Sequence, residues 1–398
     1  MKLLLIHNYY GSETPSGENQ VFEAEKKLLE DNGHEVLLLT RHSDELRDKG
    51  IGGLLKGALV TAWNPCAAAH TRRTVDQFQP DVVHVHNTFP LLSPAIFRAI
   101  GNRAAKVLTL HNYRLFCPAA IPMCKGEVCT QCLDKNTKIP SLIYGCYRNS
   151  RLATLPVALC GALHKAFGTW KRYVDAFIVL SEFQKRLMIK AGLPAARVHV
   201  KPNFFAGTPT PISWEDRDNY AVFAGRLSEE KGVQQLVEAW VKWGEQAPEL
   251  RILGDGPLRQ SLEDKAASST RIRFLEQLEQ SEAESQIARA KLLILPSIWF
   301  EGFPMVIREA FAFGTPAAVS NLGPLPSIVE NGKNGLVFEP GSPDSLLQTV
   351  RANWNDDRLK HLGQTARKEY ETWYTEDANY QMLMDIYEKA LQQRTGGE

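Results

Sequence analysis

The sequence predicts an α/β protein made of two doubly wound parallel-sheet domains. Its 398 residues exceed one ordinary hydrophobic core and suit two domains of roughly 150–200 residues each. In both halves, short apolar runs typical of buried parallel strands alternate with loops and helical segments. A linker rich in proline and glycine, at 201–212, separates the halves. We therefore expect domains at 1–203 and 204–373, with a last helix at about 374–392 that packs back on the first domain.

Composition excludes several classes of protein. The charged and apolar fractions, 23% and 44%, are ordinary for a soluble globular chain. No apolar segment approaches the roughly 20 residues of a membrane-spanning helix, and the apolar run at 3–6 is too short for a signal-peptide core. We expect a cytoplasmic protein whose seven cysteines are thiols or metal ligands rather than disulfides.

The net charge of +1 conceals an asymmetry. Residues 1–200 hold 25 Lys+Arg against 16 Asp+Glu, and the remainder holds 21 against 29. A basic first half is suited to phosphate groups or to an anionic membrane surface, although an incidental surface imbalance explains it equally well. No nucleic-acid motif is present, so we expect no nucleic-acid partner.

The first domain begins with a βαβ unit. Strands at 2–6 and 36–40 flank a glycine-containing loop at 8–19 and a helix at 20–31, an arrangement that requires a parallel pair. The loop lacks the G-x-G-x-x-G spacing and no acidic residue ends the second strand, so a dinucleotide site is not expected.

Two further strands place histidines. Alternation along the strand at 81–86 puts His84 and His86 on one face, where such residues are usually packed and hydrogen-bonded. A helical segment at 51–77 precedes them. His111 follows the strand at 107–110, at the carboxyl end where ligands of open parallel sheets bind. We expect His111 to be functional.

Five cysteines lie close together in the loop that follows. Cys129-x-x-Cys132 has the spacing with which two thiolates share one zinc ion. Cys117 or Cys124 and Cys146 could complete the site, and we predict a structural zinc at Cys117, Cys129, Cys132 and Cys146.

Residues 148–174 combine basic and apolar side chains. Leu152, Leu155, Leu159 and Leu163 form one helical stripe. A basic amphipathic helix can lie on an anionic bilayer, and an ordinary helix covers the sheet with such a stripe. We favour the second interpretation.

The second domain carries two candidate cations. Arg226 and Lys231 lie between a strand at 220–224 and a helix at 232–243. Separated by a turn, they can converge on a diphosphate, to which arginine offers a fork of donors and lysine a compact charge. The next strand, 250–253, ends in the loop Gly254-Asp-Gly-Pro257.

The segment 292–314 is the most informative. A buried-type strand at 292–295 precedes a loop with Glu301, and Pro304 fits the first position of a helix that runs to Phe313, with Gly314 as its terminator. A helix N-terminus after a glycine loop can hold an anion, and carboxylates beside it can accept hydroxyl hydrogen bonds.

These motifs, in this order, resemble the retaining family 4 glycosyltransferases of GT-B fold, also described as glycosyl transferases group 1. The resemblance rests on TLHNYRLFCP around His111, AGRLSEEKG around Arg226 and Lys231, and the E-x7-E pair Glu301 and Glu309 with GFP after the first glutamate. It implies two Rossmann-like domains facing across a cleft. It also implies a UDP- or GDP-linked sugar donor and a glycan or lipid-diphosphate acceptor, as in bacterial surface polysaccharide synthesis.

The resemblance also implies roles for individual residues. The catalytic set is His111, Arg226, Lys231 and Glu301. Donor binding falls to these two cations and to Gly17, Gly254, Gly302, Phe303, Pro304, Met305 and Glu309. No metal is needed for catalysis when protein cations stabilise the leaving phosphate. One departure is Pro326-Ser327, where members commonly carry an acidic residue, so contacts to the donor base there are in doubt.

Other interpretations stay open. Retention is compatible with same-face attack or with a double displacement on Glu301. A nucleotide-sugar epimerase or phosphorylase of GT-B fold, or a non-catalytic partner anchored at the membrane, would share much of the pattern. An NAD-dependent oxidoreductase could have the same type of fold, but the missing G-x-G-x-x-G spacing argues against it. The expected location is the cytoplasm, with peripheral contact at the inner face of the cell membrane.

Overall fold

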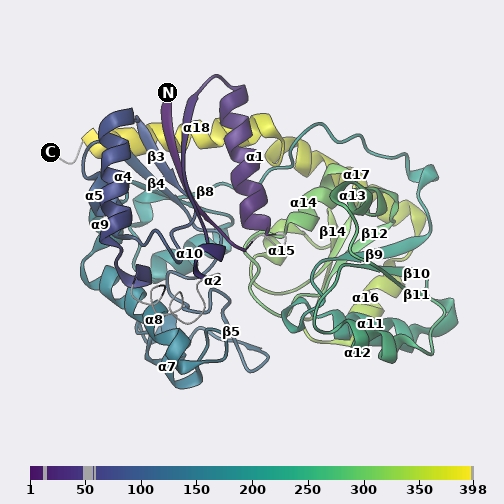
Figure 1. The fold of residues 1–398 in the computed structure, drawn as a ribbon. Coiled ribbons are helices and arrows are strands. Elements are labelled where there is room, and N and C mark those ends of the chain that lie inside the picture. The colour runs from purple at the N-terminus through teal and green to yellow at the C-terminus, as the bar shows by residue number, and fades with distance from the viewer. Residues whose placement is uncertain (12–15, 48–56, 58–59, 396–398) are drawn as a thin grey trace. The chain divides into compact units, whose positions relative to one another are not determined.

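The computed structural model describes residues 1–11, 16–47, 57 and 60–395, and these form two compact units. The first unit comprises Met1–Cys124, Cys129–Pro202 and Asn379–Glu398, and the second comprises Lys125–Val128 and Asn203–Ala378. Each unit contains a six-stranded sheet in which every strand pair is parallel (Figure 1). The predicted fold class, two doubly wound parallel-sheet domains, is confirmed.

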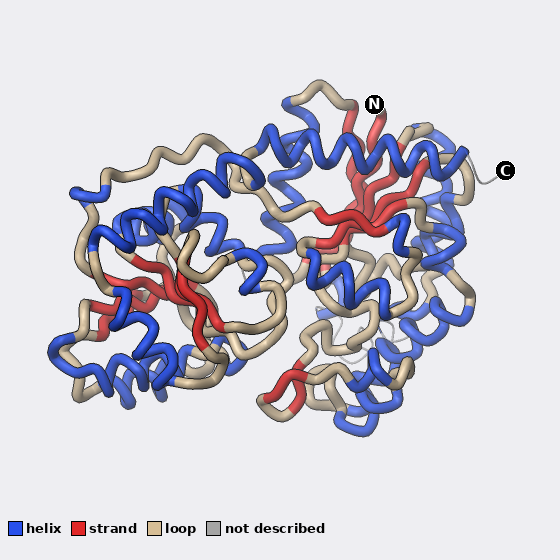
Figure 2. The backbone as a smooth tube through the Cα atoms, turned by 180° about the vertical axis from the view of Figure 1, so that it is seen from behind, coloured by secondary structure: helices blue, strands red, loops and turns tan. Residues whose placement is uncertain are grey.

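The sheet of the first unit has the order β2-β1-β3-β4-β7-β8. Leu3 of β1 lies between Val36 and Val82 of its neighbours, and residues 3–6 are fully buried. Helices cover both faces, which explains why these strands are continuous apolar runs (Figure 2). The strands are β1 (Lys2–Tyr9), β2 (Glu35–His42), β3 (Val82–Val85), β4 (Ala105–Thr109), β7 (Ala176–Val179) and β8 (Val198–Val200).

Helices from both ends of the chain pack on this sheet. The last helix, α18 (Glu376–Thr395), buries Leu383, Ile386 and Tyr387 in the same hydrophobic core as Leu3 and Leu5. The others are α1 (Gly17–Asp31), α2 (Asp44–Arg47), α4 (Pro65–Phe78), α5 (Ala95–Ile100), α9 (Thr169–Tyr173) and α10 (Glu182–Lys190).

A loop-rich insertion lies between β4 and β7. It consists of short elements, and its longest helix follows two small ones. The elements are β5 (Met123–Cys124), β6 (Glu127–Val128), α6 (Gln131–Asp134), α7 (Ile139–Tyr144) and α8 (Arg151–Ala166).

The sheet of the second unit has the order β11-β10-β9-β12-β13-β14. Trp240 of α11 is fully buried in its core and donates its indole N–H to Pro248 O. The strands are β9 (Tyr220–Ala224), β10 (Glu249–Leu253), β11 (Ile272–Leu275), β12 (Leu292–Leu295), β13 (Ala317–Ser320) and β14 (Gly335–Phe338). The helices are α11 (Val233–Trp243), α12 (Arg259–Ala266), α13 (Gln280–Arg289), α14 (Met305–Ala312), α15 (Leu325–Ile328), α16 (Pro343–Asn353) and α17 (Asp356–Trp373).

Several predicted elements need correction. Helix α1 begins at Gly17 rather than at residue 20, and α17 was not predicted at all. The predicted helical segment 51–77 is confirmed only from Pro65, and residues 51–56, 58 and 59 lie outside the described part.

The prediction that the leucine stripe covers the sheet is wrong. Helix α8 buries Thr154, Val157 and Ala158 instead. Leu152, Leu155 and Leu159 on its other face are 85%, 52% and 53% exposed. A stripe at helical spacing marks one face of a helix, but spacing alone does not say which way that face turns.

Candidate functional site

The second unit has its topological switch point beside β9. From β9 the chain proceeds to β10 and β11 on one side, then returns to β12, β13 and β14 on the other. Ligands of open parallel sheets bind outside the carboxyl ends of the strands at such a point. The loops that leave β9, β10 and β12 are the ones that contain Arg226 and Lys231, Gly254, and Glu301.

Three glycines let these loops pack backbone against backbone. A Cβ on Gly232, whose φ is +68°, would lie 1.9 Å from Pro296 O. A Cβ on Gly254, at φ +121°, would lie 2.2 Å from Gly225 O, and one on Gly256 would lie 2.5 Å from Leu227 O. Only glycine fits at these positions. Gly254, which the resemblance assigns to donor binding, is therefore also required for the close packing of this loop.

Lys231 and Glu301 are direct partners. Lys231 Nζ donates to Glu301 Oε1 over 2.8 Å and lies 5.5 Å from the centroid of the Trp299 ring. The same carboxylate oxygen accepts from Ser297 Oγ at 2.6 Å and from Trp299 Nε1 at 3.1 Å. The resemblance assigned Lys231 to the diphosphate and Glu301 to sugar hydroxyls. Their hydrogen bond places both groups in one small polar cluster, which fixes the ammonium before any ligand binds.

Arg226 lies in the loop after β9, and its side chain is exposed. None of the described residues receives a hydrogen bond or an ion pair from its guanidinium. Its five N–H donors therefore remain available to a ligand at this strand end.

Glu309 lies on α14 with its side chain 18% exposed. Burial raises the pKa of this carboxyl, and the charge of Arg308, with Nη2 4.0 Å away, opposes the shift. No described residue donates a hydrogen bond to it. A carboxylate short of donors is suited to ligand hydroxyls, the role that the resemblance implies.

The remaining donor-site residues form the start of α14. Pro304 is the N-cap and Met305 the first helical residue, so the predicted helix start is one residue too early. Phe303 is 6% exposed and packs on Tyr374 with ring centroids 5.3 Å apart, so its side chain supports the loop. Gly302 is partly exposed, and Met305 Sδ accepts from Asn203 Nδ2 at 3.5 Å.

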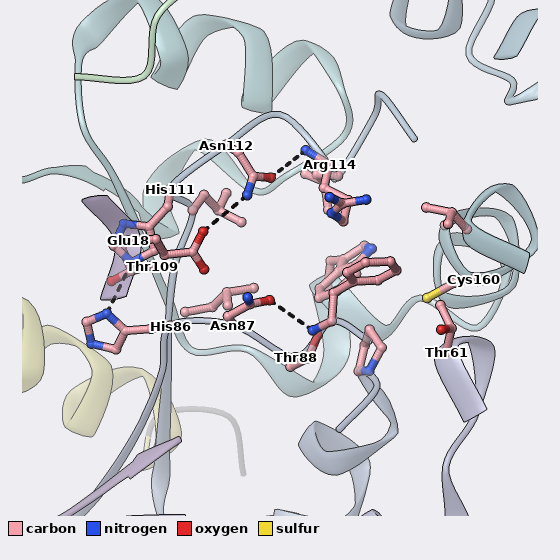
Figure 3. A pocket seen from close by; sticks show the side chains of 18 residues that line it. Glu18, Thr61, His86, Asn87, Thr88, Thr109, His111, Asn112, Arg114 and Cys160 are labelled. Atoms are coloured by element: carbon pink, nitrogen blue, oxygen red, sulfur yellow. Dashed lines mark hydrogen bonds between the residues drawn. The ribbon is translucent and has the colours of Figure 1, made fainter. Parts of the chain in front are cut away.

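The first unit has a pocket at the carboxyl ends of β3 and β4, with a cavity volume of about 100 Å³ (Figure 3). His111 lines it, where the sequence predicted this residue. Burial, and then the neighbouring His86 and His7, keep the pKa of His111 well below its usual value, so the ring is neutral at pH 7. Gly17, the exposed first residue of α1, does not line the pocket, but its neighbour Glu18 does.

Glu18, Asn112 and Arg114 are among the polar residues of this pocket that sequence reasoning missed. Asn112 Nδ2 donates to Glu18 Oε2 at 3.5 Å, and Asn112 Oδ1 accepts from the backbone N–H of Arg114 at 3.0 Å (Figure 3). Burial raises the pKa of Glu18 to about 8, although the charge of Arg114 opposes it. At pH 7 Glu18 is therefore mostly protonated and can donate a hydrogen bond. The sequence did contain a hint of these residues: Glu18 follows Gly17, and Asn112 and Arg114 lie close after His111.

The four cysteines predicted to hold zinc also lie together in the first unit. Cys117, Cys129, Cys132 and Cys146 line one small cavity, and all seven cysteines are free thiols.

Each unit thus has a polar site at the carboxyl ends of its parallel strands, the place where doubly wound α/β proteins bind their ligands. The sequence model for the family described as Glycosyltransferase Family 4 matches residues 17–205, and that for Glycosyl transferases group 1 matches residues 209–369. Together they match most of the chain, which belongs to the glycosyltransferases of this group.

The chain is similar to named proteins over parts of its length. It is 28% identical over 204 residues to an uncharacterized glycosyltransferase of Methanocaldococcus jannaschii (46% of this chain, 50% of the relative). It is 29% identical over 231 residues to an exopolysaccharide phosphotransferase of Streptomyces coelicolor (56% and 24%). The chain thus matches half or less of the length of these relatives.

Solved structures share the fold over the whole chain. Anabaena HepE, solved with UDP, superposes with a TM-score of 0.66 at 17% identity and covers 97% of this chain and 99% of its own. This likeness shows the fold.

Proposed function

We propose that the protein transfers a sugar from a nucleoside diphosphate to a glycan or lipid-linked acceptor, with retention of anomeric configuration. The observation that carries the proposal is the cluster of Lys231, Glu301, Ser297 and Trp299 at the switch point of the second sheet. Arg226, which has no ion-pair partner among the described residues, lies nearby in sequence.

The chemistry of transfer explains why cations are needed there. Negative charge grows on the departing phosphate as the bond to the anomeric carbon breaks, and charge fixed in advance stabilises it most effectively. Lys231 Nζ has three N–H bonds, of which Glu301 takes one. The ammonium and Arg226 therefore supply the positive charge, the first-turn N–H groups of α14 add to it, and no catalytic metal is needed.

The hydroxyl contacts of the donor fall to carboxylates. Glu309, to which no described residue donates a hydrogen bond, would accept hydrogen bonds from the ribose hydroxyls of the donor. Glu301 and the backbone of Gly302 would bind the hydroxyls of the donor's sugar. His111 and the protonated Glu18 would contact hydroxyl groups in the pocket of the first unit. The departing phosphate takes the acceptor proton in same-face attack.

We also propose that the acceptor side of the reaction lies at an anionic membrane surface. Helices α7 and α8 expose a patch, here called the α7–α8 patch, formed by Ile139, Ile143, Tyr144, Leu152, Leu155 and Leu159. Arg151 lies in it and donates from Nε to Ile143 O at 3.0 Å. Exposed apolar patches of this kind mark interaction surfaces.

The charge around the α7–α8 patch supports an anionic membrane as its partner. Residues 135–174 contain seven Lys and Arg and no Asp or Glu. This combination suits anionic lipid headgroups with apolar tails beneath them. None of the helices in the described part is long and apolar enough to cross a bilayer, so contact by this patch is peripheral. A lipid-linked acceptor in surface polysaccharide synthesis fits such a location, and a relative acts on exopolysaccharide by its name.

The proposal is tested by calorimetric titration with UDP- and GDP-linked sugars. We expect saturable binding of one nucleotide series, with UDP-glucose tried first because HepE binds UDP. At a free nucleotide-sugar concentration 100 times its Kd, binding should raise the free energy of unfolding by about 2.7 kcal/mol. Absence of binding for every nucleotide-sugar would refute the proposal, and consumption of the donor without acceptor would favour an epimerase.

A further inference from the structure

Behind His111 a line of buried polar side chains leads into the first unit. His111 Nε2 lies 3.1 Å from His86 Nδ1, a contact drawn in Figure 3. The other nitrogen of His86, Nε2, lies 3.2 Å from Glu25 Oε1. Glu25 and His86 are almost completely buried. The three side chains come from α1, the end of β3 and the end of β4, so the fold assembles them from separate segments.

Glu25 is the ionised end of this line. Lys201 Nζ donates to Glu25 Oε2 at 2.8 Å and to Asn379 Oδ1 at 2.8 Å. Burial alone would raise the pKa of Glu25, but its polar neighbours, Lys201 foremost, outweigh burial and hold the pKa well below its usual value. A buried carboxylate beside a buried ammonium stays charged because each compensates the other.

A metal ion is the rival explanation for this cluster. Glu25, His84 and His86 have donor atoms within 4.8 Å of one another. Lys201 already donates to the carboxylate, so a second cation would meet the repulsion of a buried ammonium. His84 is also held by Tyr387 OH at 2.8 Å and Thr109 Oγ1 at 2.7 Å. The cluster is therefore organised by the ion pair of Glu25 and Lys201.

The charge of Glu25 decides where the histidine protons lie. Glu25 Oε1 lies 3.2 Å from His86 Nε2 and 3.1 Å from His84 Nδ1, and neither Glu25 Oε1 nor His86 Nε2 has a well-aligned hydrogen bond to any described residue. A lone pair on His86 Nε2 would repel the carboxylate, so this nitrogen carries the proton. Burial, and then His84, lower the pKa of His86 to about 4, so the ring has one proton only. His86 Nδ1 is thus an acceptor, and His111 Nε2 must donate to it.

We propose that Glu25 and His86 are positioning residues that hold His111 as the tautomer with its proton on Nε2 and its lone pair on Nδ1. No described residue bonds to His111 Nδ1. This atom is then a fixed acceptor for a ligand hydroxyl in the pocket that His111 lines. The identity of the ligand rests on the proposed function, whereas the tautomer does not.

Nitrogen NMR of histidine-labelled protein tests the tautomer without any assay of transfer. In the wild type we expect the Nε2 of His111 to show the shift of a protonated nitrogen and Nδ1 that of a lone pair. His86→Leu, which removes the acceptor, should give His111 a mixture of tautomers. A wild-type His111 protonated on Nδ1, or a tautomer unchanged in His86→Leu, overturns the proposal.

Kinetics tests whether the tautomer matters. His86→Leu should lower kcat/KM about tenfold, the value of one hydrogen bond. His86→Gln should stay within about threefold of the wild type, because its amide can donate to Glu25 and accept from His111. His70→Asn, at an exposed position of α4, is the matched control. Equal losses in His86→Leu and His86→Gln, with unchanged unfolding midpoints, would contradict the positioning role.

A second and independent inference concerns the cysteines of the insertion. Cys117, Cys129, Cys132 and Cys146 line one cavity, although they come from three separate short segments, of which one holds both Cys129 and Cys132. The insertion has few buried apolar side chains to order it. Lys138 lies among its loops, donates to Leu115 O and Phe116 O at 3.0 and 2.8 Å, and adds positive charge. We propose that these four thiolates bind one structural zinc ion.

The thiols must converge when zinc binds. Tetrahedral zinc with bonds of about 2.3 Å sets its sulfurs about 3.8 Å apart. No three cysteine sulfurs among the described residues lie mutually within 4.8 Å, so metal binding would draw the segments closer.

Metal analysis of protein purified without added zinc decides this proposal. We expect close to one equivalent of zinc, reduced to well below half in Cys132→Ser and unchanged in Cys66→Ser, whose thiol is exposed on α4. Chelation should lower the unfolding midpoint of the wild type and not that of Cys132→Ser. Well below one equivalent in the wild type, or full zinc content in Cys132→Ser, would refute the assignment.

Discussion

Replacing Lys231 with alanine is expected to lower kcat/KM by about two orders of magnitude, or about 3 kcal/mol of transition-state stabilisation. Glu301 and Trp299 hold the ammonium in place, so no free energy is spent on ordering it when the phosphate departs. Steady-state kinetics with the donor identified by calorimetry measures the effect. It should appear in kcat more than in KM, because the charge on the phosphate grows in the transition state.

The control must separate catalysis from folding. Lys231→Ala also removes a partner from the buried Glu301 carboxylate, which keeps Ser297 and Trp299 as donors. Lys242→Ala removes an exposed lysine of α11 in the same unit and should leave kcat/KM unchanged. Turnover of Lys231→Ala close to the wild type would show that this lysine does not stabilise the leaving group.

The sequence was most informative where local physics decides the structure. Strands such as residues 292–295 are buried on both faces, so their apolar runs identify them without knowledge of their neighbours. Gly314 terminates α14 in the left-handed conformation, at φ +73°, as its type and position predicted. The parallel pairing then follows from the alternation of strands and helices.

Side-chain partners depend on packing that the sequence does not contain. Lys231 and Glu301 are 70 positions apart, and nothing in either motif indicates their hydrogen bond. Glu25 resembles any acidic residue on a helix surface until Lys201 and His86 are seen around it. The two glycines predicted at the donor site differ in outcome. Gly254 lies at a close approach of two backbone segments. Gly17 does not line the pocket of the first unit, but its neighbour Glu18 does.

The α7–α8 patch gives the second large expected effect. Changing Leu152, Leu155 and Leu159 together to serine should weaken binding to vesicles that contain anionic lipid by more than 100-fold. Burying one leucine contributes about 2 kcal/mol, whereas one Lys or Arg near such a surface contributes about 1 kcal/mol. Co-sedimentation with vesicles of phosphatidylglycerol and phosphatidylcholine measures binding. Raising the salt concentration should weaken wild-type binding only in part, because salt screens the charges and leaves the apolar contact intact.

Because the three leucines are exposed, this test separates lipid binding from folding. At 85%, 52% and 53% exposed, their side chains contribute little to the core, so the triple variant should fold and bind the nucleotide-sugar as the wild type does. Trp373→Ser removes a comparably exposed apolar side chain, 49% exposed on α17 of the second unit, and should not affect vesicle binding. If the triple variant binds vesicles as the wild type does, lipid is not the partner. If the triple variant changes the oligomeric state and the wild type does not bind vesicles, the α7–α8 patch is a contact with a second copy of the chain, because exposed apolar patches mark interaction surfaces.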